Sequence, residues 1–353
     1  MNVKHLVAVL LSLLAAVSAM AVALPRAAGG PRVEPAVSAP GSGKVRVYVL
    51  AGQSNMEGKA QLPLLEHLAA QPSTAGRFAH LRDGDGWRVR DDVWIDFLGR
   101  RGPLTVGFGS PNRVGPELDF GYVVGDHHGD PVLIVKTAWG GRSLYRDFRP
   151  PSAGLPGDEA LASLLTAEQK RDPERTLEQV RASFGRDYRG MLAEVDRALR
   201  EARETFPAMG DGEYVLSGFV WFQGWNDQYG GAELEYEQNL RNFIGDVRKD
   251  LDAPELPFVI GVMGQNGAGE AKGAMLAIQK AQTAVTDMRG VVAVHTDKLE
   301  DEAAAQLYPE WKQRFEEWER TGSDRRYHYL GSAIWFSRIG FALADAMLPM
   351  VKN

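Results

Sequence analysis

The sequence of 353 residues contains no cysteine. This excludes disulfides, a thiolate nucleophile and thiolate metal ligands, so a folded domain must depend on its apolar core for stability. An excess of basic residues is also missing, because 40 Lys and Arg stand against 46 Asp and Glu, for a net charge of −6. This charge balance argues against a nucleic-acid partner.

Long apolar runs are scarce, and the run near the N-terminus extends only over residues 6–17. It follows Lys4 and precedes A-x-A patterns at residues 19–21 and 21–23, which are typical of signal-peptide cleavage sites. The run is short for a membrane span. We therefore predict an exported protein, periplasmic or extracellular, with no stable membrane insertion after cleavage. Its predicted parts are a signal peptide at 1–23, a flexible Pro- and Gly-rich linker at 24–44 and one domain at 45–350.

Apolar, β-rich segments alternate with helical patterns along the predicted domain. The predicted strands are 45–50, 131–137, 214–222, 258–263 and 291–295, and the predicted helices are 187–206, 233–251, 271–285 and 332–348. Residues 310–320 predict a charged amphipathic surface helix, to which we assign no chemistry. Continuous apolar strands separated by helices are typical of a parallel sheet covered on both faces. We predict an α/β fold, a three-layer flavodoxin-like sandwich around a five-stranded parallel sheet.

Polar and glycine residues follow each predicted strand. They occupy residues 52–56, 138–143, 223–227, 264–266 and 296–297. Ligands of parallel α/β sheets bind at the carboxyl ends of the strands, so this clustering favours a site there. Plain turns, which also prefer Gly and Asn, are the alternative.

Ser54 lies directly after the first predicted strand, in the run VRVYVLAGQSNMEG. A serine at this position either caps the next helix or acts as a nucleophile. A nucleophilic serine needs a base, and histidine is the usual one. His328, in RYHYLGS before the last predicted helix, and His295, at the end of the fifth strand, are placed where they can reach this edge.

Four motifs occur in order at these positions: GQSNM, KTAWGGRSL, WFQGWND and YHYLGS. Together they resemble the SGNH hydrolase superfamily, and more closely its sialate O-acetylesterase-like domains and the acetylxylan esterases of carbohydrate esterase family six. The resemblance covers about residues 45–348. It implies a flavodoxin-like fold, a serine–histidine hydrolytic site that uses no metal or other cofactor, and an acetylated glycan, such as a polysaccharide or sialic acid, as substrate.

The resemblance also implies roles for individual residues. Ser54 corresponds to the nucleophile and His328 to the general base. The oxyanion hole would comprise the backbone N–H groups of Ser54 and Gly141 and the side-chain amide of Gln223. The residues that we expect to bind substrate are Gln53, Asn55, Arg142, Trp225 and Asn226.

The chain departs from the family pattern at two positions. Trp225 stands where many relatives have Glu, and Arg325 stands where superfamily members often have the Asp that orients the catalytic histidine. We assign that carboxylate to Asp324, with Asp227, Asp297 or a serine–histidine dyad as alternatives. These departures support a second hypothesis, a catalytically weak carbohydrate-binding protein with the same fold.

Overall fold

The computed structural model describes residues 43–351. The predicted signal peptide and most of the predicted linker lie outside this range. Among the described residues, none of the helices is long and apolar enough to cross a membrane.

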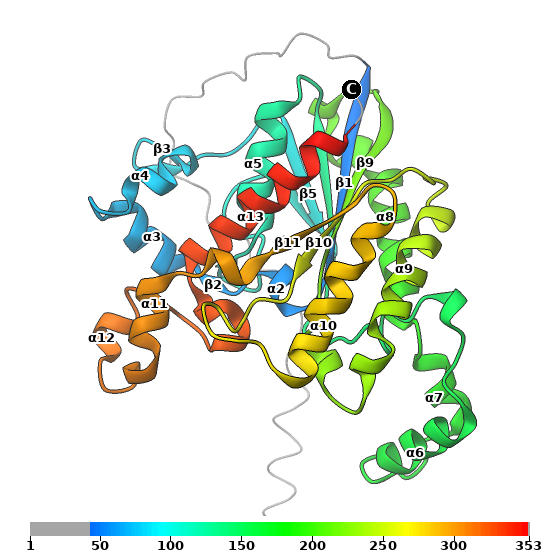
Figure 1. The fold of residues 1–353 in the computed structure, drawn as a ribbon. Coiled ribbons are helices and arrows are strands. Elements are labelled where there is room, and N and C mark those ends of the chain that lie inside the picture. The colour runs from blue at the N-terminus through cyan, green and yellow to red at the C-terminus, as the bar shows by residue number, and fades with distance from the viewer. Residues whose placement is uncertain (1–42, 352–353) are drawn as a thin grey trace, which may run out of the picture. The chain divides into compact units, whose positions relative to one another are not determined.

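A seven-stranded sheet with the strand order β11-β10-β9-β1-β8-β5-β6 forms the centre of the fold (Figure 1). Its strands are β1 (Lys44–Gly52), β5 (Val93–Phe97), β6 (Arg100–Pro103), β8 (Val132–Ala138), β9 (Glu213–Phe222), β10 (Phe258–Val262) and β11 (Val291–His295). Neighbouring strands are parallel except β5 and β6, which form an antiparallel hairpin at one end of the sheet. The predicted α/β class is confirmed, and the five predicted strands are present as β1, β8, β9, β10 and β11.

The predicted strand number of five is wrong, because β5 and β6 extend the sheet beyond β8. The sequence of β5, VWIDF, contains Asp96, and aspartate is disfavoured in strands. In the structure the Asp96 carboxylate lies 2.8 Å from the guanidinium of Arg197. Because a paired charge can be buried at lower cost than an isolated one, β5 is buried along its whole length despite the aspartate.

Helices cover both faces of the sheet, as in a three-layer sandwich (Figure 1). On one face, α5 (Glu117–His127) packs beside α13 (Ala333–Met347). The other face is covered by α8 (Arg186–Thr205), α9 (Tyr236–Asp250) and α10 (Gly273–Ala284). Alternate residues of β1 contribute to the two cores, Tyr48 and Leu50 to the first and Val47 and Val49 to the second. This alternation explains why β1 is apolar at nearly every position.

The remaining elements lie in the connections between these layers. The helices are α2 (Ser54–Glu57), α3 (Leu62–Ala70), α4 (Ala75–Phe78), α6 (Asp158–Gln169), α7 (Leu177–Ser183), α11 (Glu302–Leu307) and α12 (Phe315–Trp318). Two small antiparallel ladders pair β2 (Ala60–Gln61) with β7 (Arg113–Val114) and β3 (Arg82–Asp83) with β4 (Gly86–Trp87). The 3-10 helices are Ala79–Leu81, Pro151–Ala153, Pro207–Met209, Trp225–Gln228, Ala232–Leu234, Val285–Asp287, Thr296–Leu299, Tyr308–Glu310, Arg326–Gly331 and Leu348–Met350.

Residues 310–320 do not form the single surface helix that their charge pattern predicts. They form the end of a 3-10 helix and the four-residue α12. Trp318 of α12 is buried in the same core as α5 and α13, and Trp311 packs against that core. Burial of Trp318 and packing of Trp311 against the core therefore shape this segment more strongly than its charges do.

The carboxyl ends of the three central strands meet at one edge of the sheet. Gly52, the last residue of β1, is the register partner of Ala138 at the end of β8 and of Phe222 at the end of β9. The segments after these strands start side by side, namely 53–57, 139–143 and 223–228. This is the edge where the sequence predicts the site.

Candidate active site

Ser54 is the first residue of α2, which follows β1 after a sharp turn. The strand ends in Gly52, where a Cβ atom would lie 2.1 Å from the carbonyl oxygen of Phe222. A glycine is therefore required for β1 and β9 to approach this closely. Gln53 occupies the N-cap position of α2, so the alternative in which Ser54 caps the helix is wrong.

A buried ion pair supports this turn. The Nζ atom of Lys136 in β8 lies 2.8 Å from the Glu117 carboxylate in α5 and donates a hydrogen bond to the carbonyl oxygen of Glu57 in α2. Both charged side chains are fully buried. Loss of one partner of such a pair typically costs about 3–5 kcal/mol, so this pair holds α2 firmly against β8.

The side chains of Ser54, His328 and Asp324 form a row in space, with His328 in the middle. The Nε2 atom of His328 is 3.1 Å from the Ser54 Oγ. Its Nδ1 atom is 3.1 Å from the Asp324 Oδ2, which is the distance of an ion pair, although the angles are not those of a well-aligned hydrogen bond. The structure thus brings together a hydroxyl, an imidazole and a carboxylate in the order that nucleophilic catalysis uses.

An unusual loop conformation presents His328 to Ser54. The 3-10 segment Arg326–Gly331 contains Tyr329 and Leu330 with φ of 51° and 59°, in the left-handed region that ordinary residues avoid. The Tyr329 hydroxyl accepts a hydrogen bond from the Gly264 backbone N–H and lies 2.7 Å from the Thr296 Oγ1. These buried contacts stabilise a backbone that would otherwise be unfavourable.

The loop is also attached to the nucleophile segment and to Asp324. The side-chain amide of Asn55 donates to the carbonyl oxygen of Tyr327 at 3.1 Å. The backbone N–H groups of Ser323 and Asp324 both donate to the carbonyl oxygen of Leu330. Asn55, which we expected to bind substrate, therefore orients the histidine loop in this structure.

Arg113 completes the surroundings of Asp324. Its guanidinium lies 3.1 Å from the Asp324 Oδ2, and the backbone N–H of Arg325 donates to the Oδ1 at 2.7 Å. Burial alone would raise the pKa of Asp324, but His328, the Arg325 N–H and Arg113 hold that pKa below its ordinary value. Arg113 is distant in sequence and was not predicted, because nothing in its local sequence points to Asp324.

The two alternative carboxylates have other partners. Asp227 accepts hydrogen bonds from the backbone N–H groups of Leu144 and Tyr145. Asp297 lies 3.0 Å from Lys298 and 3.8 Å from His295. The carboxylate beside His328 is thus the one that the sequence analysis assigned.

Gln223 and Asp227 belong to a buried network beside Ser54. The Nε2 atom of Gln223 donates to the Asp227 carboxylate at 2.6 Å, to the carbonyl oxygen of Arg142 at 2.9 Å and to the Gln53 Oε1 at 3.2 Å. The Gln53 amide in turn donates to the Asn226 Oδ1. The side chains of Gln223, Gln53 and Asn226 are thus linked by hydrogen bonds. To donate to an oxyanion, the Gln223 amide would have to break one of its present hydrogen bonds.

Asp227 is 0 % exposed. Burial raises its pKa to about 7, against the opposite effect of the N–H donors from Gln223, Leu144 and Tyr145. The carboxylate connects the loop after β9 with the loop after β8. Its hydrogen bonds hold these two loops, which are distant in sequence, next to each other.

The glycine turn after β8 is bound to the nucleophile helix by Glu57. The backbone N–H of Gly140 donates to the Glu57 Oε1 at 2.7 Å. The Oε2 atom accepts from Lys59 at 2.6 Å and from Ser110 at 3.0 Å. Burial opposes ionisation, but Lys59, Ser110 and Gly140 hold the pKa of Glu57 below its ordinary value. Sequence reasoning missed Glu57, although it lies three residues after Ser54, on the same short helix.

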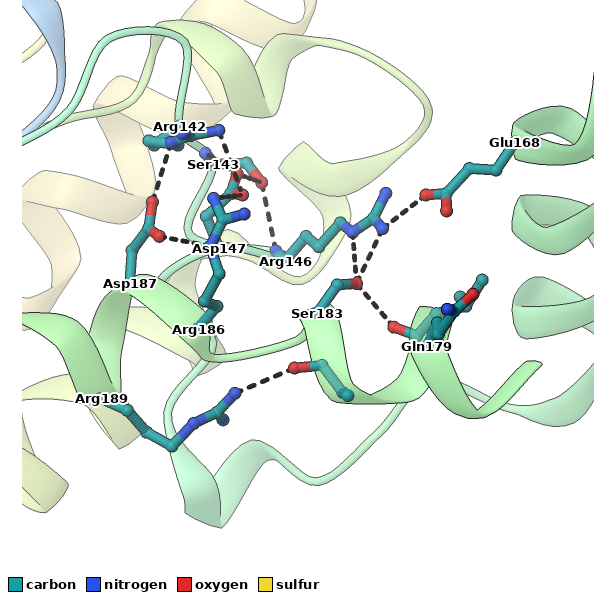
Figure 2. Close-up of polar contacts among 12 residues, drawn as sticks. Arg142, Ser143, Arg146, Asp147, Glu168, Gln179, Ser183, Arg186, Asp187 and Arg189 are labelled. Atoms are coloured by element: carbon teal, nitrogen blue, oxygen red, sulfur yellow. Dashed lines mark hydrogen bonds and ion pairs between the residues drawn. The ribbon is translucent and has the colours of Figure 1, made fainter. Parts of the chain in front are cut away.

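Arg142 lies in a network of charges next to this turn (Figure 2). Its Nε atom is 2.9 Å from the Asp187 carboxylate, and it remains about one-third exposed. Arg146 follows on the same loop and contacts Ser183 of α7 and Glu168 of α6. Arg142, predicted to bind substrate, is therefore already paired with an acidic side chain.

Trp225 and Tyr327 form an aromatic wall beside His328. Their ring centroids are 5.9 Å apart, and the Tyr327 ring is 4.5 Å from the imidazole. They line a cavity of about 340 Å³ that also includes Gln265 and Arg325. We call it the Trp225 cavity. Tyr327 was not among the predicted substrate residues, although it directly precedes His328 in the sequence.

Within residues 43–351, no group of three or more His, Asp or Glu side chains is arranged to hold a metal ion. The residues at this edge provide a hydroxyl with a neighbouring base, N–H groups of the backbone and of side-chain amides, and an aromatic wall. This combination is suited to attack on a carbonyl carbon and stabilisation of the resulting oxyanion.

Comparison with known proteins gives a family for most of the chain. Residues 44–307 match the family described as "Carbohydrate esterase, sialic acid-specific acetylesterase". The matched range includes Ser54 and Gln223 and ends before Asp324 and His328. No match is found among curated proteins.

Several solved structures are similar to this chain, including the following three. A protein from Arabidopsis thaliana shares 16% identity over 86% of this chain and 98% of its own, with a TM-score of 0.50. A carbohydrate acetylesterase from Xanthomonas citri shares 15% identity over 72% of this chain and 51% of its own, with a TM-score of 0.41. NanS shares 15% identity over 72% of this chain and 78% of its own, also with a TM-score of 0.41. At these identities the Arabidopsis structure supports the fold.

Proposed function

Since this chain belongs to the sialic acid-specific acetylesterase family of carbohydrate esterases, we propose that it removes O-acetyl groups from an acetylated polysaccharide or sialic acid through an acyl-enzyme on Ser54. The observation that carries the proposal is the Ser54–His328–Asp324 arrangement, with 3.1 Å at each step. A hydroxyl is a weak nucleophile at neutral pH, and contact with a base is what activates it.

In the proposed mechanism, the Nε2 of His328 takes the proton from the Ser54 hydroxyl as the Oγ attacks the acetyl carbonyl carbon. The Asp324 carboxylate stabilises the imidazolium that forms. When the tetrahedral intermediate collapses, His328 returns the proton to the departing sugar oxygen. Water activated by the same imidazole then hydrolyses the acetyl-enzyme, and acetate leaves.

The proposed oxyanion donors are the backbone N–H groups of Ser54 and Gly141 and the side-chain amide of Gln223. One such donor typically stabilises the transition state by about 3 kcal/mol. The Glu57–Gly140 hydrogen bond supports this role because it holds the neighbouring turn in place. Trp225 and Tyr327 would contact the sugar, because Tyr327 packs against His328 and Trp225 packs against Tyr327.

We also infer export, from the apolar run at residues 6–17 and the A-x-A patterns that follow it. Neither feature lies within the described residues. An acetylated glycan outside the cytoplasm is consistent with that location.

The test combines a serine-reactive fluorophosphonate probe with acetate release from acetylated xylan and O-acetylated sialic acids. We expect the wild-type protein to be labelled and to release acetate, and Ser54→Ala to do neither. The alternative, a catalytically weak carbohydrate-binding protein, predicts glycan binding without labelling or acetate release. Labelling that persists in Ser54→Ala would overturn the assignment of the nucleophile.

A further inference from the structure

A second cavity, of about 650 Å³, lies between α3 and residues 311–325. We call it the α3–α12 groove. Most of one wall of the groove comes from residues beyond the range 44–307 that matches the family. Its volume falls in the range typical of small-molecule sites.

We propose that the α3–α12 groove binds further sugar units of the glycan whose acetyl ester is held at Ser54. This inference rests on the proposed esterase function, and it assigns a length requirement to the substrate.

The groove adjoins the active site directly. Asp324 and Arg113, which line it, form the ion pair that contacts His328. Arg325 lines both the α3–α12 groove and the Trp225 cavity, so the two cavities adjoin at this residue. A glycan with one sugar in the Trp225 cavity can therefore extend toward the groove.

The lining combines aromatic faces with polar side chains. Phe315, which is 53 % exposed, and the partly buried Trp311 supply the aromatic part. The Arg325 guanidinium lies over the Trp311 ring, 4.1 Å from its centroid, and Trp318, which also lines the groove, is buried. A pyranose ring has apolar C–H faces and hydroxyls around its edge, so it needs flat apolar surfaces next to hydrogen-bonding groups. Arg320 and Glu319 provide such groups at the same wall. The exposed Phe315 ring is accessible to a ligand in the groove.

The same lining disfavours an acyl chain. Charged side chains such as Arg320, Glu319 and Asp324 would lose hydration against a hydrocarbon tail without gaining a partner. Sugar hydroxyls can replace the lost water as hydrogen-bond donors and acceptors. The groove is therefore suited to a polar, ring-containing ligand.

The experiment uses the full-length protein and two exposed-side-chain variants, Phe315→Ala and the control Leu234→Ala. Leu234 is 84 % exposed and lies outside both cavities. Each protein is assayed with p-nitrophenyl acetate, which has no sugar, and with acetylated xylo-oligosaccharides and O-acetylated sialyl oligosaccharides of one to six units. Thermal unfolding midpoints show whether each variant is folded.

We expect wild-type kcat/KM to rise with chain length in whichever oligosaccharide series is cleaved. Phe315→Ala should lower kcat/KM for the longer members by about tenfold, mainly through KM, and leave p-nitrophenyl acetate hydrolysis unchanged. Leu234→Ala should match the wild type on every substrate. Cleavage of the neutral or the sialylated series identifies which kind of glycan the groove accepts.

Wild-type hydrolysis of p-nitrophenyl acetate without any gain from longer chains would overturn the groove proposal and leave the esterase function standing. Equal losses on p-nitrophenyl acetate and on oligosaccharides in Phe315→Ala would also overturn it, because they indicate a structural role. Absence of hydrolysis of every substrate would instead contradict the proposed function itself.

Discussion

The two halves of the active site satisfy their polar groups in different ways. Ser54, His328 and Asp324 form one half, in which the histidine and carboxylate keep some exposure and Asp324 has an arginine partner. In the other half, Gln223 and Asp227 are 3 % and 0 % exposed and are bound by amides and backbone N–H groups. The first half has the groups that the proposed proton transfer needs, and the second connects the loops after β8 and β9.

This difference is consistent with the separate demands of acyl transfer. Proton transfer needs a base in contact with the nucleophile and a charge that stabilises the protonated base. Stabilisation of an oxyanion needs donors whose positions do not change during the reaction. The buried network of Gln223, Gln53 and Asp227 fixes the position of the Gln223 side chain, but the Gln223 amide must release one of its acceptors before it can donate to an oxyanion.

The largest effect should follow from Ser54→Ala, which removes the proposed nucleophile. We expect kcat to fall by about 10⁴–10⁶-fold, because later steps depend on the acyl-enzyme. The thermal midpoint should stay near that of the wild type, since the change removes one hydroxyl. Ser152→Ala, at an exposed position, is the matched control and should retain full activity. Activity of Ser54→Ala within tenfold of the wild type would refute the assignment.

Asp324→Asn should have the next largest effect, because the amide removes the charge that stabilises the His328 imidazolium. The expected loss is roughly 10²–10⁴-fold in kcat. Asp297→Asn is the matched control, since Asp297 pairs with Lys298, and it should change kcat by less than about threefold. Near-parental activity in Asp324→Asn would indicate a Ser54–His328 dyad.

The carboxylates of the two halves should affect the pH dependence of stability in opposite directions. The pKa of Asp324 is lowered on folding, so its stabilisation is present above the unfolded-state pKa and is lost as the pH falls through the folded-state value. The pKa of Asp227 is raised to about 7, so its stabilisation is present below about pH 3.8 and is lost as the pH rises through 7.

Urea unfolding from pH 3 to pH 8 measures both effects. Through Asp227, the free energy of unfolding of the wild type should decrease by roughly 4 kcal/mol between pH 4 and pH 7. Asp227→Asn should not show this decrease. Through Asp324, the free energy of unfolding of the wild type should increase as the pH rises in the range below about pH 4. Asp324→Asn should not show this increase. Parallel curves for the three proteins would contradict the proposed difference between the two halves.

The smallest effect should follow from Glu57→Gln, which tests the link between the halves. The variant keeps the side-chain shape but weakens the acceptor for the Gly140 N–H and removes the partner of Lys59. We expect about a tenfold decrease in kcat with little change in KM, since Glu57 binds the Gly140 N–H in the turn to which we assign an oxyanion donor. Glu66→Gln, at an exposed position, should be silent. An effect confined to KM would mean that Glu57 acts on substrate binding.

Local patterns predicted much of the fold. The five apolar strands are present, and the predicted helices 187–206, 233–251 and 332–348 correspond to α8, α9 and α13 with small shifts at their ends. The pattern failed at α5, where Glu117 and Asp119 interrupt the apolar positions. In the structure these carboxylates pair with Lys136 and His80, so the helix is buried in the core despite its acidic residues.

The sequence by itself determined the α/β class, the edge of the sheet that carries the site and the candidate residues Ser54, His328 and Asp324. The class and the edge follow from periodicity, because alternation and spacing report which side chains face the core or a strand end. The three residues come from the resemblance of four short motifs to a known family. Only the tertiary structure decided that Arg113 pairs with Asp324, that Glu57 binds the glycine turn, and that Gln223 is held by Asp227. Such contacts join segments far apart in the chain. Their geometry depends on how the layers pack, which no local pattern encodes.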